Sequence, residues 1–327
     1  MRIIFGLLMA SVAGAASGQT LMVGNKVEHT ISFIDLATGK EVARRETGRA
    51  PHEMAVSPDG RTAVAVSYRE KGFNGTTLHL FDVGGARAIG TIPLPGHEGL
   101  HGLKWLPGNK VIVTSEVTKN VALVDVAKRK LVASIPTGQD VSHMVAVGPG
   151  ARTAYVANIG SGSFSAIDLK TNRKTDDVAI GKGAEAIAVS PDGRELWVGA
   201  NGDKKVVLFD IATLKKRAEF PTPGVPIRVE FTPNGRHAVI SLPDANKVLV
   251  VDARSRKTLR AIDLGAMKLE GPVTMLFAPD GKRLWVAATG SEAVAEIDPR
   301  SWTVVRTLKA GKSADGLAFS RAITRPR

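Results

Sequence analysis

The chain alternates short apolar runs with tight turns, and one such unit recurs along its length. In the clearest copy, residues 184–201, the apolar runs 186–189 and 196–199 flank the turn Ser190-Pro191-Asp192-Gly193. Proline presets φ at the first turn position, and glycine accepts the positive φ that closes the turn. The unit therefore predicts a β-hairpin.

The hairpin repeats at a nearly constant period. Further copies begin at Pro51, Leu100, Ser142, Pro226 and Pro272, and a shortened copy begins at Ala314. The turn proline falls at positions 58, 107, 149, 191, 233 and 279, with Arg at 321, so the spacings are 49, 42, 42, 42, 46 and 42 residues. Two more strand patterns follow each hairpin. Four strands in a period in the forties are typical of the all-β fold called the β-propeller.

The two ends of the chain fall at different points of the repeat. The chain opens on a second strand, residues 21–25, and closes on a first strand, residues 316–320. One blade must then combine strands 2–4 from the N-terminus with strand 1 from the C-terminus, which removes the free edges of an open array. We predict a seven-bladed β-propeller with this three-plus-one closure, forming a single domain over residues 19–327.

The first 18 residues have the pattern of a secretory signal peptide. Arg2 precedes the apolar run 3–12 and the small residues 13–18, and cleavage after Ala15 or Gly18 fits this pattern. The run is too short for a typical membrane span, although an uncleaved anchor is the alternative. The chain has no Cys, which excludes disulfides and thiolate metal sites. We expect a periplasmic or secreted monomer with no membrane span.

Several segments resemble a known family of propellers. The segments YVAN at 155–158, IDLATGK at 34–40 and AVSPDG at 55–60 and 188–193 resemble the YVTN repeat of bacterial YncE-like seven-bladed propellers. The resemblance covers about residues 21–320 and implies the fold. It leaves the function open, because propellers host binding, lyase, lactonase and oxidoreductase chemistry alike.

One repeat position carries most of the candidate chemistry. In a propeller the first strands line the axial channel, and the position six residues before the turn proline lies at the channel mouth. It reads His52, His101, His143, Glu185, Ile227, Val273 and Asp315. Imidazoles with carboxylates suit Zn, Mn, Fe or Cu and leave a coordination position open. We predict a divalent metal held by His52, His101, His143, Glu185 and Asp315; the alternative is that the histidines only cap the inner strands.

Other residues near the mouth are candidates for catalysis or ligand binding. His52, His101 and Glu53 are the candidate acid–base groups. The candidate ligand contacts are Arg69 and Phe73 in the long loop 68–76, His97 and Glu98 before the next first strand, Arg228 on an inner strand, and Glu270 in the loop 266–271. The loop 68–76 is equally compatible with a mobile insertion, and Arg228 with an ion pair to Glu230 or Glu53.

Two further resemblances concern the chemistry. Pro51-His52 before a Ser-Pro-Asp-Gly turn is similar to the pattern in seven-bladed lactonases of the phosphogluconolactonase type. The His/Glu constellation resembles that of streptogramin lyase, a metal-assisted propeller enzyme. Neither resemblance extends to a full motif, so neither transfers a catalytic residue.

The net charge of +13 comes largely from turns between third and fourth strands, such as residues 128–130, 215–217 and 254–257. We interpret these residues first as protection of outer strands against edge pairing, and second as attraction to anionic envelope polymers. No nucleic-acid, nucleotide, haem or flavin motif is present.

Two functions therefore remain open. The first is an exported binding or interaction protein whose channel mouth holds a small molecule, an envelope polymer or a protein. The second is a metal-assisted lyase, lactonase or hydrolase at the same site, in which a metal-bound water or a neutral histidine removes a proton. There Arg69 or Arg228 would stabilise developing negative charge.

Overall fold

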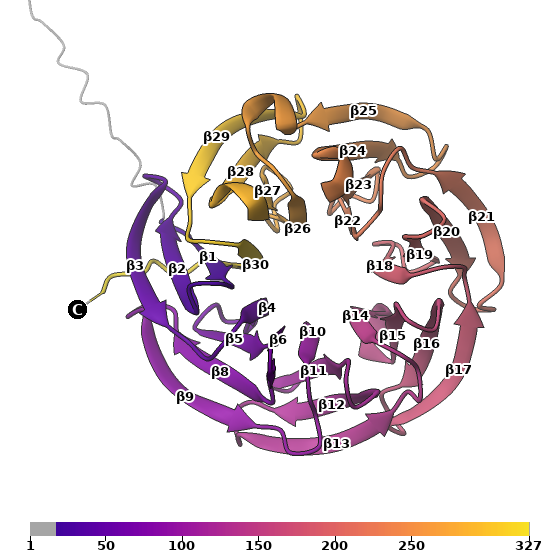
Figure 1. Cartoon of the computed structure of the whole chain (residues 1–327), viewed down its shortest axis with the longest axis horizontal. Helices are drawn as coiled ribbons and strands as arrows, with labels where there is room; N and C mark the ends of the chain where they lie inside the picture. The colour runs from indigo at the N-terminus through magenta and orange to yellow at the C-terminus, as the bar shows by residue number, and fades with distance from the viewer. Residues whose placement is uncertain (1–17, 327) are drawn as a thin grey trace, which may run out of the picture.

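A computed structural model describes residues 18–326. Within them, seven four-stranded antiparallel sheets stand around a common axis like the blades of a propeller (Figure 1). The all-β, seven-bladed fold expected from the repeat is thereby confirmed. Apart from Gly18, the expected signal peptide lies outside the described residues.

Each blade is numbered here from the N-terminus, and its strands are given from the axis outward. Blade 1 holds β30 (Ala314–Ser320), β1 (Thr20–Asn25), β2 (Thr30–Asp35) and β3 (Lys40–Glu46). Blade 2 holds β4 (Pro51–Val56), β5 (Thr62–Ser67), β8 (Thr77–Asp82) and β9 (Arg87–Pro93). Blade 3 holds β10 (Leu100–Leu106), β11 (Lys110–Ser115), β12 (Asn120–Asp125) and β13 (Lys130–Pro136).

The remaining blades follow the same order. Blade 4 holds β14 (Ser142–Val147), β15 (Thr153–Asn158), β16 (Ser163–Asp168) and β17 (Arg173–Ala179), and blade 5 holds β18 (Ala184–Val189), β19 (Glu195–Ala200), β20 (Lys205–Asp210) and β21 (Lys216–Pro221). Blade 6 holds β22 (Arg228–Phe231), β23 (His237–Leu242), β24 (Lys247–Asp252) and β25 (Thr258–Asp263). Blade 7 holds β26 (Pro272–Phe277), β27 (Leu284–Ala288), β28 (Ala293–Asp298) and β29 (Thr303–Lys309).

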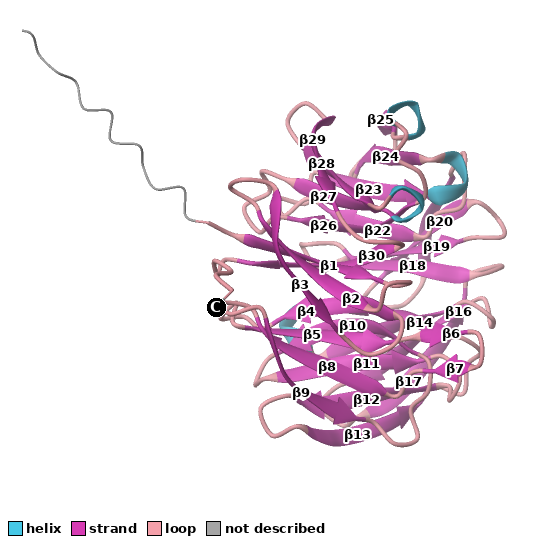
Figure 2. Ribbon diagram, turned by 60° about the vertical axis from the view of Figure 1, so that its left-hand side comes forward, coloured by secondary structure: helices cyan, strands magenta, loops and turns pink. Residues whose placement is uncertain are grey.

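Short elements join some of these strands. Single 3₁₀ turns occur at η1 (Pro149–Ala151), η2 (Pro243–Ala245), η3 (Gly265–Met267) and η4 (Thr289–Ser291), drawn in cyan in Figure 2. The long loop of blade 2 forms its own hairpin from β6 (Arg69–Glu70) and β7 (Phe73–Asn74), where the sequence had indicated only a loop. None of the helical segments in residues 18–326 has the length and apolar character needed to cross a membrane.

The ring closes as the sequence predicted. β30 pairs antiparallel with β1, with Thr20 opposite Ser320 and Met22 opposite Ala318. Blade 1 is thus completed by the last strand of the chain, and the inner strand β30 packs beside β4 of blade 2. Because each blade has a neighbour on both sides, the ring leaves no blade face open.

The hydrophobic core is divided among the blade interfaces. Seven clusters of buried apolar side chains occur in the described residues, each shared by two neighbouring blades. Trp197 and Trp285, expected in the core, are 0% and 2% exposed. Their indole N–H groups donate to Glu195 Oε2 at 2.9 Å and to Glu296 Oε2 at 3.3 Å, so neither polar atom is left unpaired.

A β-bulge recurs near the start of most inner strands. In blades 1–5 and 7 the pairing register between the first two strands shifts near the mouth, for example between Leu100 and Leu103 in blade 3. Such a β-bulge bends a strand and redirects its side chains. The bulge spans the repeat position that carries His52, His101 and His143 in blades 2, 3 and 4.

The closing strand gives the first prediction. A chain ending at Ser313 lacks β30, so it exposes the edge of β1 and the side of β4, and we expect it to aggregate and to lose the cooperative urea transition. Leu317→Ala, which removes one buried side chain without opening the ring, should lower the free energy of unfolding by about 2–5 kcal/mol. A chain lacking only residues 326–327 serves as the control. An unchanged urea midpoint in the Ser313 truncation would contradict the closure.

Candidate functional site

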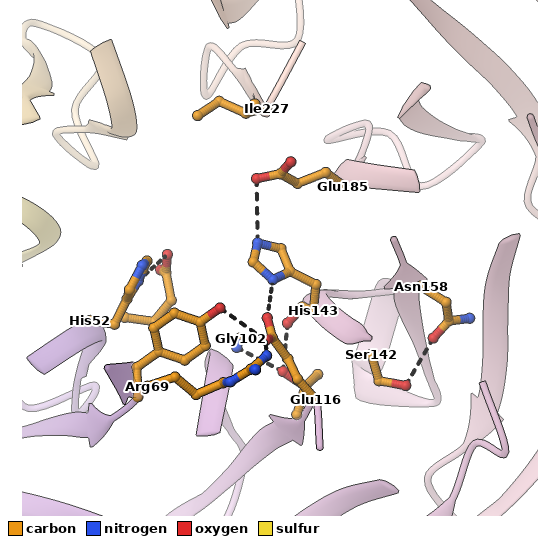
Figure 3. A network of polar contacts seen from close by, with 12 residues as sticks. His52, Arg69, Gly102, Glu116, Ser142, His143, Asn158, Glu185 and Ile227 are labelled. Carbon is orange, nitrogen blue, oxygen red and sulfur yellow. Dashed lines mark hydrogen bonds and ion pairs between the residues drawn. The ribbon is translucent and has the colours of Figure 1, made fainter. Parts of the chain in front are cut away.

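Three histidines meet at one end of the axis. The ring centroids of His101 and His143 lie 3.6 Å apart with the planes 28° from parallel, and those of His52 and His101 lie 4.2 Å apart. The three residues are only 5%, 1% and 7% exposed in the order His52, His101, His143. Figure 3 shows His52 and His143 on one side, with Ile227, the apolar member of the same repeat position, across the channel.

Two glycines let neighbouring inner strands approach closely, Gly102 between blades 3 and 4 and Gly316 between blades 1 and 2. A Cβ atom on Gly102 would overlap the carbonyl oxygen of His143, and one on Gly316 would overlap that of His52. Thr114 bridges the first of these contacts, because its hydroxyl donates to His143 O and accepts from Gly102 N at 2.7 Å. The small residue after the bulged position thus sets the spacing between adjacent blades.

Carboxylates hold the outer histidines in place. His52 Nε2 lies 3.1 Å from Asp315 Oδ2, whose other oxygen accepts from Thr274 Oγ1 at 3.2 Å. His143 is held on both sides: Nδ1 makes a short hydrogen bond to Glu116 Oε1, and Nε2 lies 3.4 Å from Glu185 Oε1 (Figure 3). Such partners fix both the tautomer and the orientation of an imidazole.

Glu116 is the site residue that the sequence analysis missed. It directly follows β11, is 3% exposed, and accepts from Tyr68 Oη at 2.9 Å and from Arg69 Nη1 at 3.1 Å. The signal was available in the position directly after each second strand, which faces the same mouth. That position reads Lys26, Tyr68, Glu116, Ile159, Asn201, Pro243 and Thr289. Lys26 Nζ lies 4.7 Å from the Tyr68 ring centroid, and Asn201 donates to Glu185.

Two overlapping sets of side chains have the arrangement of a metal site. One is His52, Glu53 and His101, and the other is His101, Glu116 and His143; within each set the ligand atoms lie no more than 4.8 Å apart. The five-ligand set expected from the sequence stays a prediction, and these two sets divide its residues differently. His101 belongs to both sets, Glu53 and Glu116 supply the carboxylates, and Glu185 and Asp315 contact the outer histidines instead.

The two sets differ in which nitrogen atoms are free. Both nitrogens of His143 face carboxylates, so a metal in the second set would have to displace the bond to Glu116. In the first set, His52 Nδ1 and His101 Nδ1 are buried and have no hydrogen-bond partner among the described residues. His52 Nδ1 lies 3.8 Å from Glu53 Oε1. Buried polar atoms without partners are rare in folded proteins, so this set is the better candidate for a bound ion.

A buried ion pair lies beneath the histidines. Arg228 Nη2 of blade 6 donates to Glu53 Oε1 of blade 2 at 2.7 Å, and Arg228 Nη1 lies 3.7 Å from Glu185 Oε1. Arg228 is 4% exposed and Glu53 7%. Of the two partners that the sequence left open for Arg228, the structure pairs it with Glu53, and the pair joins blades from opposite sides of the ring.

Along the row formed by His52, His101 and His143, the surroundings raise the pKa of one histidine and lower the pKa of another. Burial opposes the charging of His143, but its hydrogen bonds to Glu116 and Glu185 prevail and raise its pKa. Burial and the neighbouring histidines lower the pKa of His101 well below its usual value. Although burial disfavours ionised Glu53, Glu116 and Glu185, nearby cations and hydrogen bonds lower all three pKa values. The surroundings therefore favour the neutral form of His101 and the protonated form of His143.

Four residues predicted as ligand contacts lie elsewhere or are otherwise engaged. His97 is fully buried with Nδ1 3.0 Å from Ser115 Oγ, so it folds back into blade 3. Phe73 lies under the Arg49 guanidinium at 4.6 Å, and Glu98 accepts from Asn74 Nδ2 at 3.2 Å. Glu270 is exposed on the rim. None of the four belongs to either metal-capable set. Arg69, 44% exposed in its side chain, does reach the site through Glu116.

Comparisons with known proteins agree on a β-propeller and diverge on function. A family model described as the cytochrome D1 heme domain matches residues 106–228. The chain is 29% identical over 117 residues to a 6-phosphogluconolactonase of Cronobacter sakazakii, covering 34% of each protein. It is 24% identical over 203 residues to antigen Lp49 of Leptospira interrogans, covering 57% of this chain and 44% of that protein. These matches thus span less than half of each relative.

Similarity in structure extends much further than similarity in sequence. A chain of hydrazine synthase from Kuenenia stuttgartiensis superposes with a TM-score of 0.75, covering 90% of this chain and 99% of its own, at 19% identity. At that identity the likeness shows the fold alone.

The mouth does not fit a haem. The rings of His52, Tyr68, His101 and His143 contact one another at centroid distances of 3.6–4.8 Å and leave no slot for a macrocycle between them. His143 is the one histidine in the segment matched by the haem-domain model, and carboxylates occupy both of its nitrogens. We therefore derive no step through haem.

The opposed pKa shifts of His101 and His143 give the second prediction. In ¹⁵N-imidazole NMR titrations, His143 should remain protonated above the ordinary histidine pKa and His101 should remain neutral below it. Because the folded-state pKa of His143 is raised, its contribution to stability is complete below about pH 6.5 and is lost as the pH rises through the folded-state value. Glu116→Gln should lower the pKa of His143, whereas Asp177→Asn, on an outer strand, should not. A His143 that titrates below His101 would contradict this arrangement.

Proposed function

We propose that this propeller is a metal-dependent ligand-binding protein whose centre lies at the channel mouth. His52, His101 and Glu53 would hold one divalent transition-metal ion, and a small anionic ligand would bind to it. The observation that carries the proposal is the pair of buried, unpartnered nitrogens, His52 Nδ1 and His101 Nδ1, beside the Glu53 carboxylate. Three protein ligands leave a coordination position open for water or a ligand.

The charges around the histidines support a bound cation. Four carboxyl groups line the mouth, from Glu53, Glu116, Glu185 and Asp315. Arg228 is a buried cation that faces them, and hydrogen bonds to Glu116 and Glu185 raise the pKa of the buried His143. Uncompensated charge is costly in a buried site, and a divalent ion would balance the excess. Asp315 on His52 Nε2 has the geometry of the outer carboxylate that commonly supports a metal-binding imidazole.

The rim would select an anionic ligand. Arg69 is partly exposed, and its Nη1 contacts Glu116; Lys26 lies over the Tyr68 ring. These two cations flank Tyr68 above the histidines, so an anionic group on the metal would be attracted and screened from the carboxylates below.

A second candidate function is hydrolysis or elimination at the same centre. It is favoured by the partial similarity to 6-phosphogluconolactonases and by the neutral, unpartnered Nδ1 of His101. A metal there would activate a water molecule or polarise a carbonyl group. In the alternative without a metal, the free Nδ1 of neutral His101 would accept the proton from the attacking water or the substrate. In either case Arg69 would stabilise the developing negative charge.

Metal content is the third prediction. Protein purified without chelator or His-tag should carry close to one metal ion per chain by mass spectrometry, because three ligands converge. His52→Ala and His101→Ala should each lower the metal content at least tenfold. His143→Ala should retain the metal, because both nitrogens of His143 face carboxylates.

His237→Ala, a change on β23 outside both metal-capable sets, is the matched control. Metal lost equally from His237→Ala, or absent from folded wild-type protein after incubation with Zn²⁺ or Mn²⁺, would overturn the metal centre. The metal-loaded protein should also be assayed on a glucono-lactone. Hydrolysis abolished by His101→Ala would support the enzyme, and its absence would leave the binding function.

We also propose that the protein is exported and belongs with the YncE-like YVTN-repeat propellers. The basic, apolar and small-residue order of residues 1–18 supports export.

The fourth prediction tests export. Expression of the full chain with its leader in a Gram-negative host should give a periplasmic protein whose intact mass corresponds to cleavage after Ala15 or Gly18. An uncleaved chain in the cytoplasmic fraction would refute the proposal.

A further inference from the structure

A cavity lies at the end of the inner strands opposite to the histidines. Its volume is about 290 Å³, and it is lined by β10, β14, β18 and β22, the inner strands of four consecutive blades. Most of its wall is apolar and includes Ala146, Ala188 and Phe231. Pro191 of the Ser-Pro-Asp-Gly turn also lines it, so the cavity lies on the turn side of the ring, away from the histidines.

Three polar side chains line this cavity, those of Lys104, Trp105 and Glu230. Lys104 on β10 is exposed, forms no ion pair within the described residues and lies three residues along the strand from His101. Trp105, next to it, has a buried Nε1–H with no hydrogen-bond partner. Glu230 of β22 is half-buried, and burial together with nearby Glu53 raises its pKa, although Lys104 and Arg228 oppose the shift. Small-ligand sites commonly combine an apolar wall with a few such groups.

The Glu53–Arg228 ion pair separates this cavity from the histidine site. Arg228 and Glu230 stand two residues apart on β22 and therefore share one face of the strand. Arg228 binds Glu53 on the histidine side, while Glu230 lines the cavity on the turn side. The two ends of the channel are thus chemically different. Four carboxyl groups lie at the histidine end, whereas Glu230 is the one carboxyl group among the lining residues of the mostly apolar cavity at the turn end.

The turn side also carries much of the basic charge. The turns between third and fourth strands lie at the same end of each blade as the Ser-Pro-Asp-Gly turns, and they include the basic runs 128–130 and 254–257. The aspartates that open these turns are engaged by turn backbone amides, as Asp125 is by Lys128 N and Asp252 by Ser255 N. Residues 128–130, Arg254 and Lys257 are exposed, whereas Arg256 pairs with Glu195. The exposed cations would attract an approaching anion to this side.

We propose that the cavity is a binding site for a small carboxylate with an apolar body. Lys104 would pair with the carboxylate, Trp105 Nε1–H would donate to it, and the apolar wall would enclose the hydrocarbon. The site is independent of the proposed metal centre.

The fifth prediction uses the indole N–H signals of the four tryptophans as reporters, with hexanoate and benzoate as probes. In ¹H–¹⁵N correlation spectra, saturation with either probe should shift the Trp105 indole signal, which Trp105→Phe identifies by its loss. The indoles of Trp197 and Trp285, already bonded to glutamates, should not move. Lys104→Met should weaken binding at least tenfold, while Lys110→Met, on the neighbouring strand β11, should not.

Three results would overturn the proposal. The first is an unmoved Trp105 signal at saturating probe, and the second is unchanged affinity in Lys104→Met. The third is equal binding of hexanol, which would show that the cavity accepts apolar molecules without regard to charge. Because metal content is measured separately, failure here leaves the metal centre untouched, and loss of the metal centre leaves this test valid.

Discussion

The close approach of the inner strands at one end of the axis is the constraint on which the site depends. Seven strands of similar sequence converge there, so residues at one repeat position meet although they are about forty positions apart in the chain. Gly102 and Gly316 allow the backbones of neighbouring blades to touch, and the bulge turns the preceding residue toward the channel. A row of stacked imidazoles, which a flat sheet would keep apart, follows from these two features.

The arrangement of charges at the mouth also depends on the convergence of the inner strands. Several blades contribute polar side chains, and none of the buried ionisable groups alone would remain charged. Together they form a graded row, with His52 against Asp315, a neutral His101, and His143 between two glutamates. The buried Glu53–Arg228 ion pair lies next to this row. Removing one member leaves its neighbour buried and unpaired, so the group is stable only as a whole.

The fold was predictable because the sequence features that indicate it recur along the chain. Turn prolines, strand alternation and the offset of the two termini each occur in several copies, and one irregular copy does not change the result. The histidine row was predictable for the same reason. Individual contacts were not, because they depend on rotamers and on loops outside the repeat. Glu116 was missed although it shares a repeat position with Tyr68, whereas His97, close to the mouth in sequence, turns back into blade 3. Glu185 and Asp315, predicted as metal ligands, lie beside the outer histidine nitrogens; their binding to a metal stays a prediction.

The inner strand of blade 1, β30, is synthesised after every other strand of the ring. Asp315, which orients His52, lies on it, and so does Gly316, against which the His52 backbone rests. During translation every other part of the mouth is complete before this strand emerges. A chain that stops early therefore contains the histidines without the carboxylate that fixes the first of them. Assembly of the site is thus coupled to closure of the ring, since β30 supplies both the inner strand of blade 1 and the carboxylate beside His52.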